Sequence, residues 1–363
     1  MNIFVFGSSI TSSYWNGAAT YYRGIYKNLH ALGHQITFAE PDIYGRQQHR
    51  DAGPFDYVNV IVYKSGRQLD SLLQQASQAD LVIKHSGIGA DDERLENDVL
   101  LCCQAYSSPW VIFWDVDAPA TLARVEENPA DAFRRLIPQY DAIFTYGGGP
   151  RVCRQYLELD ARQCFPVYNA LDPQTHYPAT PHSILRCDLA FVGNRLPDRE
   201  KRVEDFFLRA AELAPEMSFI LGGEGWGDKP VPRNVRKIGH VGTDQHNFVN
   251  CSARMVLNIN RDSMASTGFS PPTRVFEAAG AAACLITDTW TGIEQFFAPG
   301  KEILLASSAR EVVQHLRGVT SDQAKAIGKN MRQRALRDHT YAQRASQVEE
   351  ILQSLRRPVE AVA

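Results

Sequence analysis

Short apolar runs alternate with longer segments of helical spacing along the first half of the chain. The runs end in small or polar residues and read NIFVFG, QITFAE, DLVIKHS, WVIFWDVD and AIFTYGG. Between the first two, residues 18–33 place apolar side chains at helical intervals before Gly33, a residue type that commonly ends helices. This alternation predicts a mostly parallel sheet with helices on both faces.

The alternation restarts after residues 172–183, a segment rich in proline, histidine and small polar residues. The later runs are CDLAFVGN, SFILGGEG, VRKIGHVG, MVLNINR, ACLITD and EILLAS, and two helical patterns divided near His339 follow them. We therefore predict two doubly wound α/β domains, over residues 1–171 and 184–335, with 172–183 as their linker. Ligands of such sheets bind at the carboxyl ends of the strands, so the expected site is a cleft that both domains line.

Composition excludes several classes of partner. The 363 residues are 44% hydrophobic and 22% charged, as in soluble globular proteins, and 363 residues suffice for two domains. A net charge of -3 predicts no broad basic surface for nucleic acid or an anionic membrane. The seven cysteines lack paired spacing, and no signal peptide or run of about 18 apolar residues occurs, so we expect a cytoplasmic protein without a membrane span.

The usual nucleotide-binding fingerprints are missing. The first strand is followed by GSSITSSYWNG, which lacks the GxGxxG spacing that brings backbone close to a dinucleotide pyrophosphate. The chain also lacks GxxxxGK[ST], the phosphate-binding loop of many NTPases. The sequence YGGGP at residues 146–150 is interpreted as a plain loop, with anion binding as the alternative.

A basic turn in the second half is a candidate phosphate site. FVGNRLPDREKR follows a strand and opens a helix, which places Gly193 and Asn194 at the turn. Free backbone N–H groups, the helix dipole and arginine forks together suit a phosphate or diphosphate. The alternative is a solvated helix face, which we favour for two of these cations. The cations around this helix start are Arg195, Arg199, Lys201 and Arg202, of which the last two are assigned to the solvated face.

One glutamate stands in a segment of small apolar residues, SPPTRVFEAAGAAACLITD. Its prolines, with Ser270 as the candidate N-cap, predict a helix over TRVFEAAGA, so that Glu277 lies near the helix start. The alanines and Gly280 predict close packing of this helix on the strand ACLITD. A carboxylate there can accept hydrogen bonds from the two hydroxyls of a ribose. The alternative is a glutamate that only complements the helix dipole.

These motifs together carry a family resemblance. SPPTRVFEAAGAAACLITD, GIEQFFAPGKEILLAS, FVGNR, LGGEGWG and VLNINR resemble the second domain of GT-B glycosyltransferases, especially the spore maturation protein CgeB-like group. The resemblance covers residues 187–335 well, and the first half only in architecture and in FWDVDAPAT. It implies two Rossmann-like domains facing a cleft, a nucleotide-diphosphate sugar as donor rather than a cofactor, no metal, and a last helix, over 336–363, that returns to the first domain.

Several residues acquire roles from this resemblance. Glu277 matches the ribose-binding glutamate, Arg195 and Arg274 are diphosphate candidates, and the loop residues Ser270 and Thr273 face the phosphates. The sequence departs from many retaining members at Phe269, where they carry a second glutamate, so the stereochemical outcome stays open. The complete set of donor-binding candidates is Gly193, Asn194, Arg195, Arg199, Arg261, Ser270, Thr273, Arg274 and Glu277.

The first domain holds candidates for the base that activates an acceptor hydroxyl. His85 in VIKHSG and the pair Asp115 and Asp117 in FWDVDAP lie at the carboxyl ends of apolar strands. A carboxylate or imidazole there can take the acceptor proton. The alternatives are a helix cap for Asp117 and a buried strand-end histidine for His85. The loop residues Trp15, Asn16 and Gly17 either line the acceptor side or form a simple surface loop.

Three functions remain open from the sequence. The favoured one is metal-independent glycosyl transfer from a nucleotide sugar to an unidentified acceptor. A sugar-nucleotide epimerase or hydrolase would use the same fold without a second substrate. A non-catalytic sugar-nucleotide-binding protein would use the same donor site without any base.

Overall fold

The computed structural model describes residues 1–64, 66–104 and 109–356, which fold as two compact units. Unit 1 comprises Met1–Tyr168 and the segment from Tyr341 onward, and unit 2 comprises Asn169–Thr340. The proline-rich segment 172–183 lies inside unit 2, where His176 is buried.

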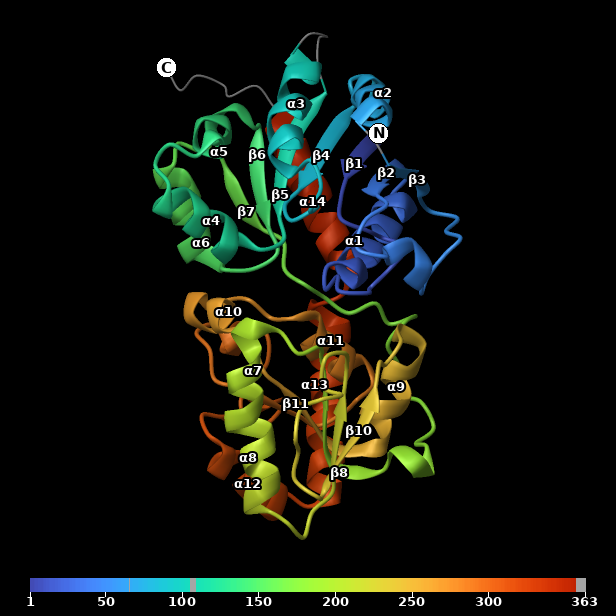
Figure 1. Ribbon diagram of the computed structural model, residues 1–363, viewed down its shortest axis with the longest axis vertical. Helices are drawn as coiled ribbons and strands as arrows, with labels where there is room; N and C mark the ends of the chain where they lie inside the picture. Colours follow the sequence, from blue (N-terminus) through green and yellow to red (C-terminus); the bar gives the residue numbers. More distant parts are fainter. Residues whose placement is uncertain (65, 105–108, 357–363) are drawn as a thin grey trace. The chain divides into compact units, whose positions relative to one another are not determined.

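Unit 1 is built on a parallel sheet of seven strands with helices on both faces (Figure 1). The strand order is β3-β2-β1-β4-β5-β6-β7, so the direction of winding reverses between β1 and β4. The strands are β1 Asn2–Phe6, β2 Gln35–Pro41, β3 Asn59–Tyr63, β4 Leu81–His85, β5 Trp110–Asp115, β6 Ala142–Thr145 and β7 Cys164–Pro166. The helices are α1 Ala19–Ala31, α2 Gly66–Ala76, α3 Asp92–Gln104, α4 Ala118–Glu127, α5 Ala132–Leu136, α6 Gly149–Glu158 and α14 Tyr341–Arg356, with 3-10 turns at Arg46–His49 and Ile137–Gln139.

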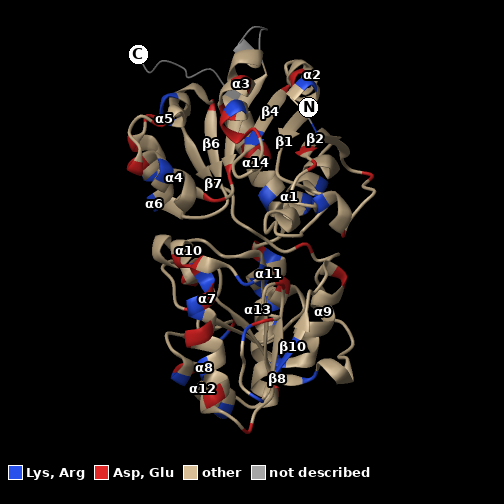
Figure 2. Ribbon diagram, in the orientation of Figure 1, with Lys and Arg blue, Asp and Glu red and all other residues tan. Residues whose placement is uncertain are grey.

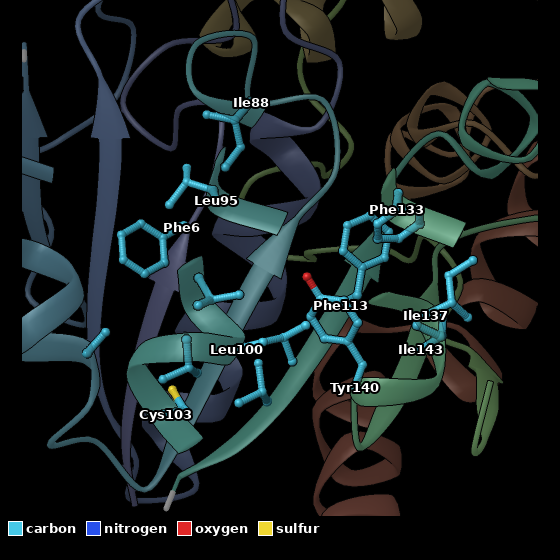
Figure 3. Close-up of a cluster of buried hydrophobic side chains, with 14 of the residues drawn as sticks. Phe6, Ile88, Leu95, Leu100, Cys103, Phe113, Phe133, Ile137, Tyr140 and Ile143 are labelled. Atoms are coloured by element: carbon cyan, nitrogen blue, oxygen red, sulfur yellow. The ribbon is translucent and has the colours of Figure 1, made fainter. Parts of the chain in front are cut away.

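Aromatic side chains fill one face of this sheet. Phe113 of β5 packs its ring 4.5 Å from that of Phe133 and 5.5 Å from that of Tyr140, measured between centroids (Figure 3). Leu95 and Leu100 of α3 belong to the same buried cluster. Rings at these separations and tilts stabilise a core beyond the area they bury. The five apolar runs predicted as strands in this half are all strands, and most of their residues are buried.

The last helix packs on unit 1. α14 lies against α1, and a Cβ placed on Gly24 of α1 would meet the Tyr341 ring of α14 at 2.2 Å. A side chain other than hydrogen would force the two helices apart. His34 Nε2 lies 2.8 Å from Glu349 Oε2 and ties the middle of α14 to the same unit. α14 therefore belongs to unit 1, and it begins at Tyr341 rather than at residue 336 as predicted.

Unit 2 is built on a second parallel sheet, in the order β10-β9-β8-β11-β12-β13, which reverses between β8 and β11. Its six strands coincide with the six predicted runs. The strands are β8 Cys187–Val192, β9 Phe219–Gly222, β10 Val235–Gly239, β11 Ala253–Asn258, β12 Leu285–Asp288 and β13 Leu304–Ala306. The helices are α7 Pro197–Val203, which continues through a π turn (Glu204–Leu208) into α8 Arg209–Leu213, then α9 Thr243–Ser252, α10 Asp262–Thr267, α11 Thr273–Gly280, α12 Ala309–Gly318 and α13 Ser321–Asp338, with 3-10 turns at Ser183–Leu185 and Ile293–Gln295.

Charges of both signs are interspersed over the helices of each unit (Figure 2). This distribution agrees with the small net charge of the chain. Within those same parts, none of the helices has both the length and the apolar character needed to cross a bilayer.

Candidate functional site

The candidate site of unit 2 lies at the carboxyl ends of β8 and β11, where the strand order reverses. β8 and β11 are paired in parallel, so the turns that follow them emerge at the same edge of the sheet. Helices leave neighbouring strands toward opposite faces at such a switch point, which leaves a crevice that ligands of open α/β sheets occupy. Gly193 and Asn194 follow β8 directly, as the sequence predicted, and Asn258 ends β11.

Two glycine turns pack closely at this edge. Gly193 donates its N–H to the carbonyl of Gly222 at 2.9 Å, and a Cβ on Gly223 would lie 2.3 Å from the Gly193 carbonyl oxygen. Gly223 also has a φ of +116°, which disfavours any side chain. Asn194 accepts a hydrogen bond from the backbone of Glu224 at 3.0 Å. The Asn194 side chain therefore holds the two turns together.

Two guanidinium groups converge on Gly193. A Cβ on this glycine would lie 2.8 Å from Arg274 Nη2 and 3.1 Å from Arg199 Nη2. Both guanidiniums also lie against the Phe191 ring, at 5.3 Å for Arg274 and 5.8 Å for Arg199. Arg199 donates to the Asn194 carbonyl, and Arg274 donates to Asn258 Oδ1 at 3.3 Å. Arg199 and Arg274 are 75 positions apart in the chain, yet their positive charges lie side by side.

These two arginines lack carboxylate partners at ion-pair distance in the described parts of the chain, although Glu277 and Asp288 act on Arg274 from farther away. Burial, and then the charge of Arg274, lower the pKa of Arg199 to about 9. Burial also lowers the pKa of Arg274. The pair is an uncompensated positive site, which an anion with two charged groups would relieve.

The other predicted phosphate ligands already have partners. Arg195 binds Glu200 at 2.8 Å and Asp228 at 3.0 Å, and these hydrogen bonds, that of Glu200 first, raise its pKa. Arg261 binds Asp198 at 2.5 Å. Neither charge is free for a phosphate without breaking an ion pair.

Of the two cations assigned to the solvated helix face, only one lies on such a face. Lys201 is exposed and pairs with Asp205 at 3.3 Å, as expected of a solvated face. Arg202 corrects that expectation, because it binds the buried Asp288 of β12 at 2.6 Å. A buried aspartate without a partner would destabilise the folded unit, so the role of Arg202 is to neutralise Asp288.

Glu277 lies in the second turn of α11, one turn beyond Arg274 on the same face. Its side chain is 10% exposed. Burial would raise the pKa of this carboxyl, but the charges of His246 and His176 outweigh it and hold the pKa below its usual range. Arg274 and a hydrogen bond from Thr273 act in the same direction. Glu277 is therefore an ionised carboxylate at neutral pH.

Two features of α11 differ from the sequence expectation. The N-cap is Pro272, without a capping side chain, and Ser270 instead donates its hydroxyl to the Gly268 carbonyl at 2.8 Å. Gly280 makes room for the segment before β8 rather than for β12, because a Cβ there would lie 2.5 Å from the His176 carbonyl oxygen. Thr273 turns toward Glu277 and so supports the carboxylate.

The sequence reasoning missed two histidines beside Glu277. His246 of α9 places Nδ1 3.5 Å from Glu277 Oε2, and its ring stacks on that of His176 with centroids 6.0 Å apart. His176 is 2% exposed, and burial lowers the pKa of its imidazole. The three residues come from segments about 30 to 100 positions apart, so no local spacing could have indicated them.

In unit 1, Asp115 is a fully buried acceptor. Its carboxylate receives hydrogen bonds from Ser86 at 2.6 Å, Tyr156 at 2.5 Å and Thr121 at 3.1 Å, and from the backbone of Asp117 at 2.9 Å. Burial raises its pKa. Asp115 joins β4, the turn after β5 and α6, so its contacts are those of a structural residue.

The other two base candidates differ in exposure. His85 is 1% exposed among aromatic rings, shares a 2.5 Å hydrogen bond between Nε2 and the Tyr26 hydroxyl, and has a pKa lowered to about 3 by burial. Asp117 is partly exposed at the N-cap of α4, yet its side chain makes no capping hydrogen bond. Helix capping is therefore not its role. Asp117 keeps a carboxylate within reach of solvent.

The residues of the loop proposed for the acceptor side differ in exposure. Asn16 is buried and donates to the carbonyls of Ser9 and Ser12, which makes it part of the loop framework. Trp15 is 43% exposed and Gly17 has open space around its Cα. Only the last two can meet a ligand without rearrangement.

Comparison with known proteins gives a consistent picture. Residues 199–350 match a protein family described as "Glycosyl transferase-like". No curated protein sequence matches the chain.

Solved structures match over nearly the whole chain. The chain is similar to Anabaena HepE in complex with UDP and glucose, with a TM-score of 0.70, 13% identity, and 98% of this chain and 100% of that chain covered. Sucrose-phosphate synthase from Thermosynechococcus elongatus matches with a TM-score of 0.68 and 12% identity, over 98% and 99% of the two chains. T4 phage BGT in complex with its UDP-glucose substrate matches with a TM-score of 0.58 and 10% identity, over 98% and 100%. At such identities the likeness shows the fold, and the predicted pair of Rossmann-like domains of the GT-B type is confirmed.

Proposed function

We propose that the protein is a glycosyltransferase that uses a nucleotide-diphosphate sugar as donor. The observation that supports this best is the two neighbouring arginines without ion-pair partners in the described parts of the chain, Arg199 and Arg274. Arg274 lies one helical turn from the ionised Glu277. In this proposal the two guanidiniums bind the diphosphate and the carboxylate accepts hydrogen bonds from the ribose hydroxyls. The UDP and UDP-glucose complexes of proteins with this fold favour a uridine nucleotide.

The same residues suit the chemistry of transfer. When the bond from the anomeric carbon to the diphosphate breaks, negative charge grows on the leaving group. Arg199 and Arg274 already supply two positive charges beside Gly193, so we propose transfer without a metal ion. Preorganised charges of this kind need no rearrangement during the reaction.

We assign proton removal from the acceptor hydroxyl to Asp117. Asp115 and His85 are buried and engaged in hydrogen bonds, which leaves Asp117 as the candidate with access to solvent. Phe269 stands where a second carboxylate would support a retaining reaction. Membership of the CgeB-like group, transfer of a hexose and a cytoplasmic location remain parts of this proposal, and the seven free thiols agree with the last.

Calorimetry and product analysis test the function together. UDP and UDP-glucose should bind the purified protein, and a ligand at 100 times its Kd should stabilise the folded state by about 2.7 kcal/mol. Incubation of labelled UDP-glucose alone separates the alternatives, because an epimerase or hydrolase converts the donor without an acceptor. Release of UDP only when a glycan or small-molecule acceptor is added supports transfer. Absence of binding to any nucleoside diphosphate would refute the donor site.

A further inference from the structure

Three potential metal ligands meet beside the proposed ribose position. His176, His246 and Glu277 each offer one donor atom, and these atoms all lie within 4.8 Å of one another. They come from the segment before β8, from α9 and from α11. A set of two imidazoles and one carboxylate is a common zinc-binding combination, with the fourth position left to water or another ligand.

The hydrogen bonding of these side chains is incomplete. His176 Nε2 and His246 Nδ1 are buried ring nitrogens without a hydrogen-bond partner in the described parts of the chain. A buried polar atom without a partner costs about 1–3 kcal/mol, so two in one cluster need an explanation. A neutral imidazole offers a ring-nitrogen lone pair for coordination.

The separation of two ligands matches a metal site better than a hydrogen bond. His246 Nδ1 and Glu277 Oε2 are 3.5 Å apart, which is long for a hydrogen bond. Ligand atoms about 2.0–2.1 Å from a tetrahedral zinc ion lie roughly 3.4 Å from each other. The remaining pairs lie within 4.8 Å and would have to approach by up to about 1.4 Å to reach the same separation. His246 has a side chain 20% exposed, which gives an ion a route to the cluster.

Charges around the cluster oppose each other. Arg274 acts on Glu277 and disfavours a second cation, whereas Asp172 acts on His176 and favours one. The carboxylate itself carries one negative charge. Two of the three ligands are imidazoles, so the site suits a transition ion better than Mg²⁺ or Ca²⁺, which prefer oxygen ligands.

We propose that His176, His246 and Glu277 form a Zn²⁺ site that competes with the nucleotide donor. The proposal rests on the proposed function, because inhibition arises from the loss of the Glu277 carboxylate to the metal. The ion here is an inhibitor and takes no part in transfer. Free Zn²⁺ would thereby reduce the affinity of unit 2 for its donor.

Direct metal titration of the full chain tests the site without any nucleotide. The metal-stripped protein should bind one Zn²⁺ per chain in competition with a chromophoric chelator, and Co²⁺ should give the visible absorption of a tetrahedral site. His246→Gln and His176→Gln should each weaken Zn²⁺ binding at least tenfold. The exposed His182 provides the matched control, and His182→Gln should bind as tightly as wild type. No binding by wild type, or equal binding by folded His246→Gln, would overturn the proposal.

A second titration separates this inference from the proposed function. UDP affinity is measured by calorimetry in EDTA and again in excess Zn²⁺. The wild type should bind UDP at least tenfold more weakly with Zn²⁺, whereas the affinity of His246→Gln should stay constant within twofold. Zn²⁺ also binds free UDP, and an equal loss in both proteins would assign the effect to solution chelation and refute competition. Failure of wild type to bind UDP in EDTA would refute the nucleotide site, while the chelator assay still reports on the metal site.

Discussion

Arg274→Gln should make unit 2 more stable and weaken its binding of diphosphates. The wild-type guanidinium lies beside that of Arg199, and neither has a carboxylate at ion-pair distance in the described parts of the chain. Glutamine removes the charge but keeps an amide that can hydrogen-bond to Asn258. The unliganded protein thus loses a repulsion, and the complex loses a ligand.

The size of the stability change follows from Arg199. Its pKa of about 9, against an ordinary value of about 12.5, corresponds to a cost of about 5 kcal/mol at neutral pH. Burial is the larger cause and Arg274 the second. Two like charges about 4 Å apart near a protein surface repel by roughly 1–4 kcal/mol, so removal of the neighbouring charge should recover on the order of 2 kcal/mol. Loss of packing on Phe191 offsets about 1 kcal/mol of this gain. The net gain of about 1 kcal/mol should raise the Tm by roughly 2–4 °C.

Arg202→Gln is the matched control, because Arg202 is an arginine with a buried partner. Its removal leaves Asp288 unpaired inside the unit and should lower stability by about 3–5 kcal/mol. Calorimetric melting of the unliganded proteins measures both changes. Equal destabilisation by the two variants would refute the reasoning about uncompensated charge.

Binding gives the second half of the test. Loss of a charge-assisted contact should weaken UDP binding by about 1.5–3 kcal/mol, or roughly 10- to 150-fold, while uridine affinity changes less than threefold. Isothermal titration of both ligands into Arg274→Gln and wild type measures this difference. Equal losses for UDP and uridine would place Arg274 away from the diphosphate.

Three further predictions concern the other candidates. Glu277→Ala should weaken UDP and uridine alike by about 2–4 kcal/mol without unfolding, and calorimetry in EDTA showing wild-type affinity would remove the ribose role. Asp117→Asn should lower kcat by roughly 10²–10⁴ at constant donor affinity and constant Tm, and full turnover of this variant would end its assignment as the base. His85 has a folded-state pKa of about 3, below its usual value of about 6.5, so the stability that its neutral form contributes is present above pH 6.5 and decreases as the pH falls toward 3. Between pH 7 and 5 this loss is about 2 kcal/mol in urea unfolding, and His85→Gln should lose correspondingly less; parallel losses in both proteins would contradict the assignment.

The sequence by itself determined the fold class and the order of the elements. Alternating apolar runs and helical spacing predicted the six strands of the second sheet and five of the seven strands of the first, but not β3 and β7. Gly33, with a φ of +93°, follows the end of α1 where expected. These signals are local, because burial of a strand or one face of a helix repeats every few residues. Gly193, at the turn after β8, could be predicted for the same reason.

Only the tertiary structure decided which charges are free to bind a ligand. Arg195 and Arg199 stand four residues apart in one motif, yet Arg195 forms ion pairs with Glu200 and Asp228, whereas Arg199 lies beside Arg274 and forms no ion pair in the described parts of the chain. Glu200 is five residues from Arg195, but Asp228 is 33 residues from it, and spacing along the sequence does not indicate contacts between such distant residues. His176 and His246 likewise reach Glu277 from segments distant in the sequence, which the fold of unit 2 brings together.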